Sequence, residues 1–267
     1  HSQLIPHMSK DFYLNERALA SCFERDWLDH VVEGEKNLHK IFSFPPFAAA
    51  ELYCPYHEQL VEFLAQTLQK TDARPERMLE IGSSLGRTYF EVCRRIKSIK
   101  TATLVEPSQN LFTGFQNIFA NAGPSRFSVL KGNNELTEVT LDSASIRAAC
   151  AAVQLECINQ SFQEWDGTQA QFDLVICSGV IDQCHDPLKL VELIKNSVIP
   201  GGIVLLACTY QWQDRYLGNA GAQIMDIGEL FDSKWRHLGA TDIPFFSRIN
   251  ERHWSKFLSH LGIFQLT

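Results

Sequence analysis

The sequence has no long apolar run and no cluster of basic residues, and each absence excludes a class of protein. No apolar segment approaches the roughly 18 residues needed to cross a bilayer, and residues 1–10 contain no apolar signal core. Lys and Arg number 24 against 31 Asp and Glu, a net charge of −7, without a basic stretch. We therefore expect neither membrane nor nucleic-acid binding; a small molecule or another protein is the expected partner.

Paired cysteines are also missing. The eight cysteines are scattered, none forms a Cys-x-x-Cys pair, and several lie in apolar stretches typical of buried strands. This pattern indicates reduced thiols in a protein core instead of zinc ligands or a disulfide framework. We therefore expect a cytoplasmic protein without a bound metal.

The length of the chain suits one large domain. With 267 residues, 45% of them hydrophobic, the chain can bury a single α/β core. Apolar residues at helical spacing predict helices over residues 15–33 and 55–69. Both precede the strand-rich part, so residues 1–70 are expected to form a helical cap. This cap is either a lid over the site or simple edge packing.

From Arg77 onward, short apolar strands alternate with helices. Continuous runs of Val, Ile and Leu indicate strands that are covered on both faces, as in a parallel sheet. Alternating strands and helices predict a doubly wound α/β core over residues 71–267. A strand and a helix are expected as an insertion around residues 127–150, and residues 242–248 and 254–267 are expected to form a closing hairpin.

The segment LEIGSSLGRT, residues 79–88, carries the strongest motif. It has the form Glu-x-Gly-x-x-x-Gly, with Ser84 where a dinucleotide fingerprint has its central glycine. Glycines at 82 and 86 allow close approach of a ligand to the backbone. The carboxylate of Glu80 would repel a pyrophosphate but could hold the ammonium group of S-adenosylmethionine (SAM), usually through water. The pattern therefore favours SAM; the predicted contacts in this turn are Glu80, Gly82, Ser83, Ser84, Gly86 and Thr88.

A second acid strengthens the cofactor prediction. Glu106 closes the strand TATLVE, 20 residues after Gly86. A carboxylate at this place can accept hydrogen bonds from both ribose hydroxyls; the alternative is a solvated acid at a strand end. Other expected cofactor contacts follow strand ends, at Pro107, Ser108, Phe162, Gln163, Ser178 and Gly179.

The order of these motifs resembles class I methyltransferases from residue 77 to the end. The turn Ile199-Pro200-Gly201-Gly202 before the next strand is also common in that superfamily. The resemblance implies a Rossmann-like, doubly wound sheet of seven strands with SAM as the cofactor.

A narrower resemblance is to the methyltransferase domain of ovothiol biosynthesis. The matching stretches are FPPFAAAEL, NNELTE, FDLVICSGVIDQCHDPLKL, CTYQW and IPFFSRINER, within residues 43–267. The resemblance implies methylation of an imidazole nitrogen of 5-thiohistidine, with a separate sulfoxide synthase or lyase of the same pathway as a partner. The chain departs from the family pattern at Cys208, Thr209, Gln211 and Ile249.

An amino-acid acceptor needs a cation for its carboxylate and an aromatic wall for its ring. Arg248 is the predicted clamp, because a guanidinium grips a carboxylate bidentately; the alternative is a surface arginine at a hairpin. Tyr210 and Trp212 follow the fifth strand and are expected to contact the imidazole, with rim packing as the alternative. Tyr53 and Tyr56 are assigned to the acceptor side of the cap, with packing again the alternative.

Methyl transfer from a sulfonium is an in-line displacement, so the main task of the protein is to position the acceptor. A neutral imidazole needs no strong base, and either Tyr210 or Asp182 is expected to accept or relay a proton. His57 lies where the cap could reach the site, with packing favoured, and His185 is assigned to a loop in preference to a role as a base. Three alternatives stay open: another small acceptor, a nicotinamide-dependent oxidoreductase, and a SAM-binding partner subunit without catalysis.

Overall fold

The computed structural model describes residues 13, 15–32, 55–131, 135–167, 171–212, 224, 226–250 and 253–267, except the side chain of Asn250. Tyr53 and the matching stretch at residues 44–52 lie outside the described residues. Within the described part, no helix combines the length and the apolar character that crossing a membrane requires.

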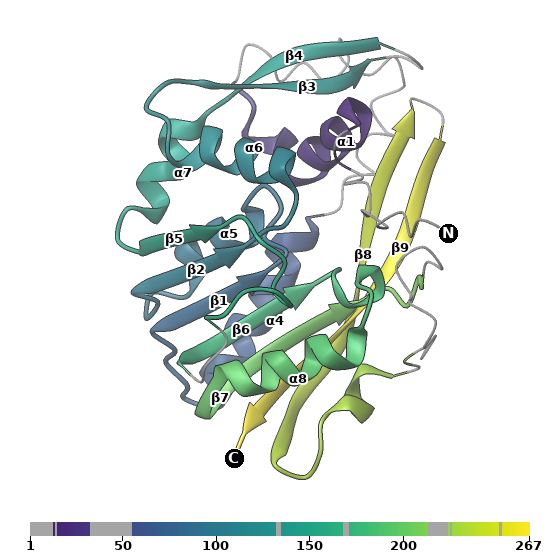
Figure 1. Cartoon of the computed structure of the whole chain (residues 1–267). Coiled ribbons are helices and arrows are strands. Elements are labelled where there is room, and N and C mark those ends of the chain that lie inside the picture. Colours follow the sequence, from purple (N-terminus) through teal and green to yellow (C-terminus); the bar gives the residue numbers. More distant parts are fainter. Residues whose placement is uncertain are drawn as a thin grey trace, which may run out of the picture.

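A seven-stranded sheet forms the centre of the molecule (Figure 1), which confirms the expected fold class. Its strand order is β5-β2-β1-β6-β7-β9-β8, and only the pairings of β9 with β7 and β8 are antiparallel. The strands are β1 (Arg77–Ile81), β2 (Thr101–Val105), β5 (Gln154–Ile158), β6 (Phe172–Ser178), β7 (Val198–Cys208), β8 (Trp235–Asn250) and β9 (His253–Leu266). The last two strands form the expected closing hairpin.

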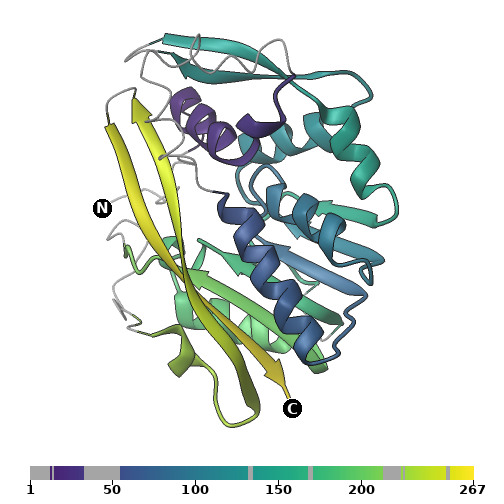
Figure 2. The ribbon, with the colours of Figure 1, turned by 180° about the vertical axis from the view of Figure 1, so that it is seen from behind.

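Helices cover both faces of this sheet. Alternate side chains of one strand enter different cores: Met78 of β1 packs on the side of α4 and α5, whereas Leu79 packs on the side of α8. Figure 1 shows α8 in front of the sheet, and Figure 2 shows α4 and α5 across the opposite face. The helices are α4 (Tyr56–Lys70), α5 (Arg87–Arg95), α6 (Gln109–Phe119), α7 (Ser143–Cys150) and α8 (Pro187–Ser197), with short 3₁₀ turns at η4 (Ile181–Gln183) and η5 (Ile227–Leu230).

The insertion contains more than the expected strand and helix. Two strands, β3 (Ser125–Lys131) and β4 (Glu135–Leu141), pair as a separate antiparallel hairpin before α7. The second strand was missed because ELTEVTL alternates polar and apolar residues with few large apolar side chains. Val139 and Leu141 are nevertheless buried, because this hairpin packs over the first helix that the structure describes.

The first described helix, α1 (Glu16–Trp27), lies between β3 and β8 (Figure 2). Asn15 caps its start, and the chain continues from Trp27 into a 3₁₀ turn, η2 (Leu28–His30). The helix is therefore shorter than the expected span of residues 15–33. Phe23 stacks on Phe127 of β3 with ring centroids 4.3 Å apart, which fixes α1 against the inserted hairpin.

Candidate active site

A cavity of about 430 Å³ lies at the carboxyl ends of β1, β2 and β6. Ligands of open α/β sheets bind at this edge, where the strand order reverses on either side of β1. The walls come from the turns after these strands, from the end of β7, and from α4, β8, β9 and residues 13 and 25. The cavity thus lies between the sheet and the first described part of the chain.

The turn between β1 and α5 has three residues in the left-handed backbone region. Their φ angles are 72° at Gly82, 53° at Ser84 and 81° at Gly86. A Cβ at Gly82 would lie 2.3 Å from Cγ2 of Val180, so only glycine fits there. Gly86 does not line the cavity: a Cβ there would meet the rings of Phe115 and Phe119, so its glycine lets α6 pack closely on the turn.

Two carboxylates line the cavity, and they differ in their hydrogen bonding. Glu80 is buried, and its Oε2 has no hydrogen-bond partner among the described residues. Burial raises the pKa of this carboxyl well above its usual value, and the negative charges of Asp26 and Glu106 raise it further. A hydrogen bond from Thr88 acts against this rise, and a cation at the carboxyl would favour its ionised form further.

Glu106 is held by the backbone. Its Oε2 accepts the N–H of Ser84 at 2.9 Å, and its Oε1 accepts the N–H of Ser108 at 2.9 Å. These bonds fix the plane of the carboxylate at the cavity wall. The cavity lining includes all the predicted cofactor residues except Gly86.

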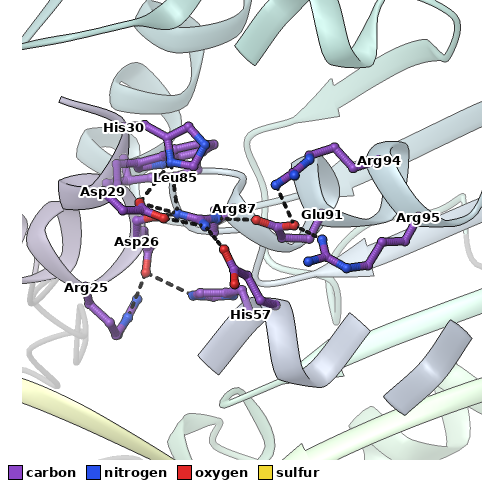
Figure 3. A network of polar contacts seen from close by, with 12 residues as sticks. Arg25, Asp26, Asp29, His30, His57, Leu85, Arg87, Glu91, Arg94 and Arg95 are labelled. Atoms are coloured by element: carbon purple, nitrogen blue, oxygen red, sulfur yellow. Dashed lines mark hydrogen bonds and ion pairs between the residues drawn. The ribbon is translucent and has the colours of Figure 1, made fainter. Parts of the chain in front are cut away.

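The sequence interpretation missed the contribution of α1, which brings Arg25 to the cavity. Arg25 donates from Nε to Oδ1 of Asp26 at 2.7 Å, and Nε2 of His57 lies 3.0 Å from the same oxygen (Figure 3). Burial opposes ionisation of Asp26, but the charges of Arg25 and His57 hold its pKa far below the usual range. Asp26 is therefore a permanent anion beside the cavity.

A buried arginine connects this part of the chain to the turn between β1 and α5 (Figure 3). Arg87 donates to both carboxylate oxygens of Asp29, at 2.7 and 2.8 Å, and to the backbone oxygen of Asp26 at 2.5 Å. It also donates to Glu58 of α4 and Glu91 of α5. Because Arg87 opens α5, this network ties η2, α4 and α5 together at the rim of the cavity.

A cluster of hydroxyl groups also lines the cavity. The Tyr56 hydroxyl lies 2.8 Å from Oγ of Ser178 and 3.0 Å from Oγ of Ser259. Burial raises the pKa of this phenol, so it stays protonated at neutral pH. The Phe245 ring lies 5.3 Å from the Tyr56 ring, and Thr209 also lines the cavity.

Arg248, the predicted carboxylate clamp, does not line the cavity. It is 3% exposed, and its Nε and Nη2 donate to the two oxygens of Glu24 at 2.8 and 2.6 Å. The guanidinium also donates to the backbone oxygen of Leu130 in β3. The structure therefore corrects this prediction: Arg248 joins β8 to α1 and β3 inside the protein.

The two predicted proton acceptors also lie outside the cavity lining. The Tyr210 hydroxyl lies 2.8 Å from Nδ1 of His260 and accepts the N–H of Ile227 at 3.1 Å. Asp182 is buried behind Thr209 and accepts its hydroxyl at 2.6 Å. Trp212 likewise does not line the cavity and packs against the core on the α8 side.

Besides Arg25, the cavity lining includes three further residues that the sequence did not assign to the site: Tyr13, His57 and His185. The Nδ1 atom of His57 lies 2.9 Å from Oγ1 of Thr88, which places this ring between Thr88 and Asp26. The only sequence signal was the charged run Glu24-Arg25-Asp26 between two apolar residues. That pattern does not indicate which of the three charged side chains reaches the cavity.

Comparisons with known proteins agree with this architecture. A family model described as a methyltransferase domain matches residues 55–257. The structure of YcgJ from Bacillus subtilis is similar with a TM-score of 0.51 and 10% identity, over 79% of this chain and 99% of that chain. N-methyltransferase NodS from Bradyrhizobium japonicum WM9 has a TM-score of 0.49 and 12% identity, over 78% of this chain and 94% of that one.

At 10% identity the likeness to YcgJ shows the fold alone. No curated protein matched the sequence. The family model, however, spans most of the chain, including the cofactor turn and the strand ends that form the cavity. The chain belongs to the methyltransferase domain family and is a SAM-dependent methyltransferase of the class I fold.

Proposed function

We propose that the cavity binds SAM and that the protein transfers the methyl group to the imidazole nitrogen of a small acceptor, 5-thiohistidine. The observation that carries the cofactor part is Glu80, whose buried Oε2 lacks a partner among the described residues. An ammonium group supplied by a ligand, directly or through water, would satisfy this oxygen and stabilise its charge. A pyrophosphate at the same place would be repelled.

The residues on the cavity wall fit the remaining parts of SAM. Glu106 would accept hydrogen bonds from the ribose hydroxyls, with its plane already set by Ser84 and Ser108. Phe162 offers an apolar surface and Gln163 a polar group after β5, where the adenine is expected. When bound, SAM supplies an electrophilic methyl carbon on a sulfonium.

The hydroxyl cluster of the cavity supports a neutral, hydrogen-bonding acceptor. Tyr56, Ser178 and Ser259 form one connected group of hydroxyls, and Phe245 offers a ring for stacking. The imidazole of 5-thiohistidine is compatible with this surface, because a ring with a pKa near 6.5 is largely neutral at physiological pH. Holding its lone pair toward the methyl carbon, about 3–3.5 Å away, is the main catalytic task.

The same proposal places the protein in a short reaction sequence. The resemblance to the ovothiol-pathway domain supports 5-thiohistidine as the acceptor and a separate sulfoxide synthase or lyase as its source. On this proposal the protein works in the cytoplasm, where the thiol of the acceptor stays reduced.

A labelled-methyl experiment tests this function. The purified protein is incubated with SAM carrying a deuterated methyl group and, separately, with 5-thiohistidine, histidine and cysteine. We expect labelled methyl on 5-thiohistidine alone, as measured by mass spectrometry, and slower transfer by a Glu106→Ala variant at a SAM concentration below its Kd. No transfer to any of the three by a SAM-binding protein would discard this acceptor, and binding of NAD in place of SAM would discard the cofactor.

A further inference from the structure

Arg25 is the only arginine or lysine among the described residues that line the cavity. Its side chain is 25% exposed, whereas the neighbouring Asp26 side chain is fully buried. The lining also contains the carboxylates of Glu80 and Glu106. A ligand that carries a carboxylate therefore meets two acids on the wall, and Arg25 is the one permanent cation there that can offset them.

The guanidinium of Arg25 makes only some of the hydrogen bonds that it can donate to the described residues. Its Nε donates to Asp26, its Nη2 donates to Sγ of Cys22 at 3.2 Å, and Nη1 has no partner among the described residues. Burial raises the pKa of the Cys22 thiol to about 12, so this sulfur is neutral and a weak acceptor. The edge of the guanidinium formed by Nη1 and Nη2 can therefore give up the weak hydrogen bond to Cys22 and bind a carboxylate instead.

Asp26 does not depend on Arg25 alone. Its Oδ1 also lies 3.0 Å from Nε2 of His57, and its Oδ2 accepts the hydroxyl of Ser84 at 3.3 Å. A turn of the Arg25 guanidinium toward a ligand therefore leaves Asp26 with partners. Figure 3 shows that the side chains of Arg25 and His57 both reach the carboxylate of Asp26.

The contacts of Arg25 lie on the cofactor side of the cavity. Cys22 and Ser84 are 3.1 Å apart, and Ser84 belongs to the turn that follows Glu80. The hydrogen-bond partners of Arg25 are Asp26 and Cys22. Neither belongs to the cluster of hydroxyls formed by Tyr56, Ser178 and Ser259. We propose that Arg25 binds the α-carboxylate of the amino-acid part of SAM, opposite the ammonium group at Glu80. This inference rests on the proposed cofactor.

Decarboxylated SAM provides the test, because it keeps the sulfonium, the ammonium and the adenosine and lacks only the carboxylate. Dissociation constants for SAM and for decarboxylated SAM are measured by titration calorimetry on the native protein, Arg25→Gln and Arg25→Lys. Arg126→Gln, at an exposed position on β3, is the matched control. We expect Arg25→Gln to raise the Kd for SAM about 10- to 100-fold. The Kd for decarboxylated SAM should rise less than about threefold.

Arg25→Lys keeps the charge but loses the planar fork, so we expect a smaller loss that is still confined to SAM. If Arg25→Gln does not fold, this variant decides the question. Equal losses for both ligands, or no loss for either, would overturn the inference while leaving SAM as the cofactor. A native protein that binds neither ligand would overturn the proposed cofactor as well.

Discussion

Glu24 and Arg248 form an ion pair inside the protein, with Nε of Arg248 2.8 Å from Oε2 of Glu24. The pair connects two segments that are far apart in the chain, α1 and β8, and Glu24 also accepts the N–H of Leu130 in β3. Because α1 carries Arg25 and Asp26 to the cavity, this remote contact supports the site without touching it.

Removal of Arg248 should therefore cost stability. Burial raises the pKa of Glu24, and Arg248 acts against that rise; without the arginine, Glu24 is left buried and unpaired. We expect Arg248→Met to lose about 3–5 kcal/mol of unfolding free energy, measured by urea denaturation. The double variant Glu24→Leu/Arg248→Met should recover part of the loss. If the single variant is as stable as the native protein, the pair does not hold α1 in place.

Glu80 should reduce the stability of the ligand-free protein at neutral pH. Its folded-state pKa is raised by burial, so the folded state holds the proton more tightly than the unfolded chain, whose glutamates titrate near about 4.3. Stability contributed by this group is present below that value and is lost as the pH rises toward the raised pKa. We expect Glu80→Gln to melt higher than the native protein at pH 8, with a difference that shrinks toward pH 4.

The same substitution should weaken SAM binding at pH 8, because an amide cannot compensate the ammonium charge. Thermal unfolding of both proteins with and without SAM measures the two effects together. A Glu80→Gln variant that melts lower than the native protein without ligand would contradict the assigned environment of Glu80. Unchanged stabilisation by SAM would contradict its role.

The Tyr56 hydroxyl should matter for turnover more than for cofactor binding. Because it bonds to both Ser178 and Ser259, its loss disturbs the surface that positions the acceptor. We expect Tyr56→Phe to lower kcat/KM for methyl transfer about 10- to 100-fold with little change in the Kd for SAM. Tyr210→Phe is the matched control, since its hydroxyl lies outside the cavity lining, and it should stay within about threefold of native. Equal effects of the two substitutions would argue against this assignment.

The cofactor side of the site could be predicted from the sequence because its signals are local. Glu80, Glu106 and Ser178 each lie within one residue of the end of an apolar strand, and parallel strands bring their carboxyl ends to one edge. The strand periodicity and the glycine turn therefore indicated the edge of the sheet at which the cavity lies, without any long-range information. The doubly wound core follows from the same alternation of strands and helices, whereas the number of seven strands was implied by the resemblance to class I methyltransferases.

The α1 side could not be predicted, because contacts distant in the sequence place it. Trp27 donates from Nε1 to the backbone oxygen of Leu85 at 3.1 Å, and Arg87 donates to Asp29. No local sequence pattern predicts either contact. Arg248 failed for a related reason. In β8 the chain buries Arg248 and leaves the next residue, Ile249, 47% exposed, beside a register shift in the ladder. Hydrophobicity alone favours the opposite arrangement.

Direct titration of the protein with SAM tests the central claim, that the cavity at the ends of β1 and β2 is the cofactor site. We expect the native protein to bind SAM, and Glu106→Ala to bind it at least about tenfold more weakly, because two ribose hydrogen bonds are lost. Glu138→Ala, at an exposed site on β4, should bind like the native protein. Equal affinity of the native protein and Glu106→Ala for SAM would contradict the claim.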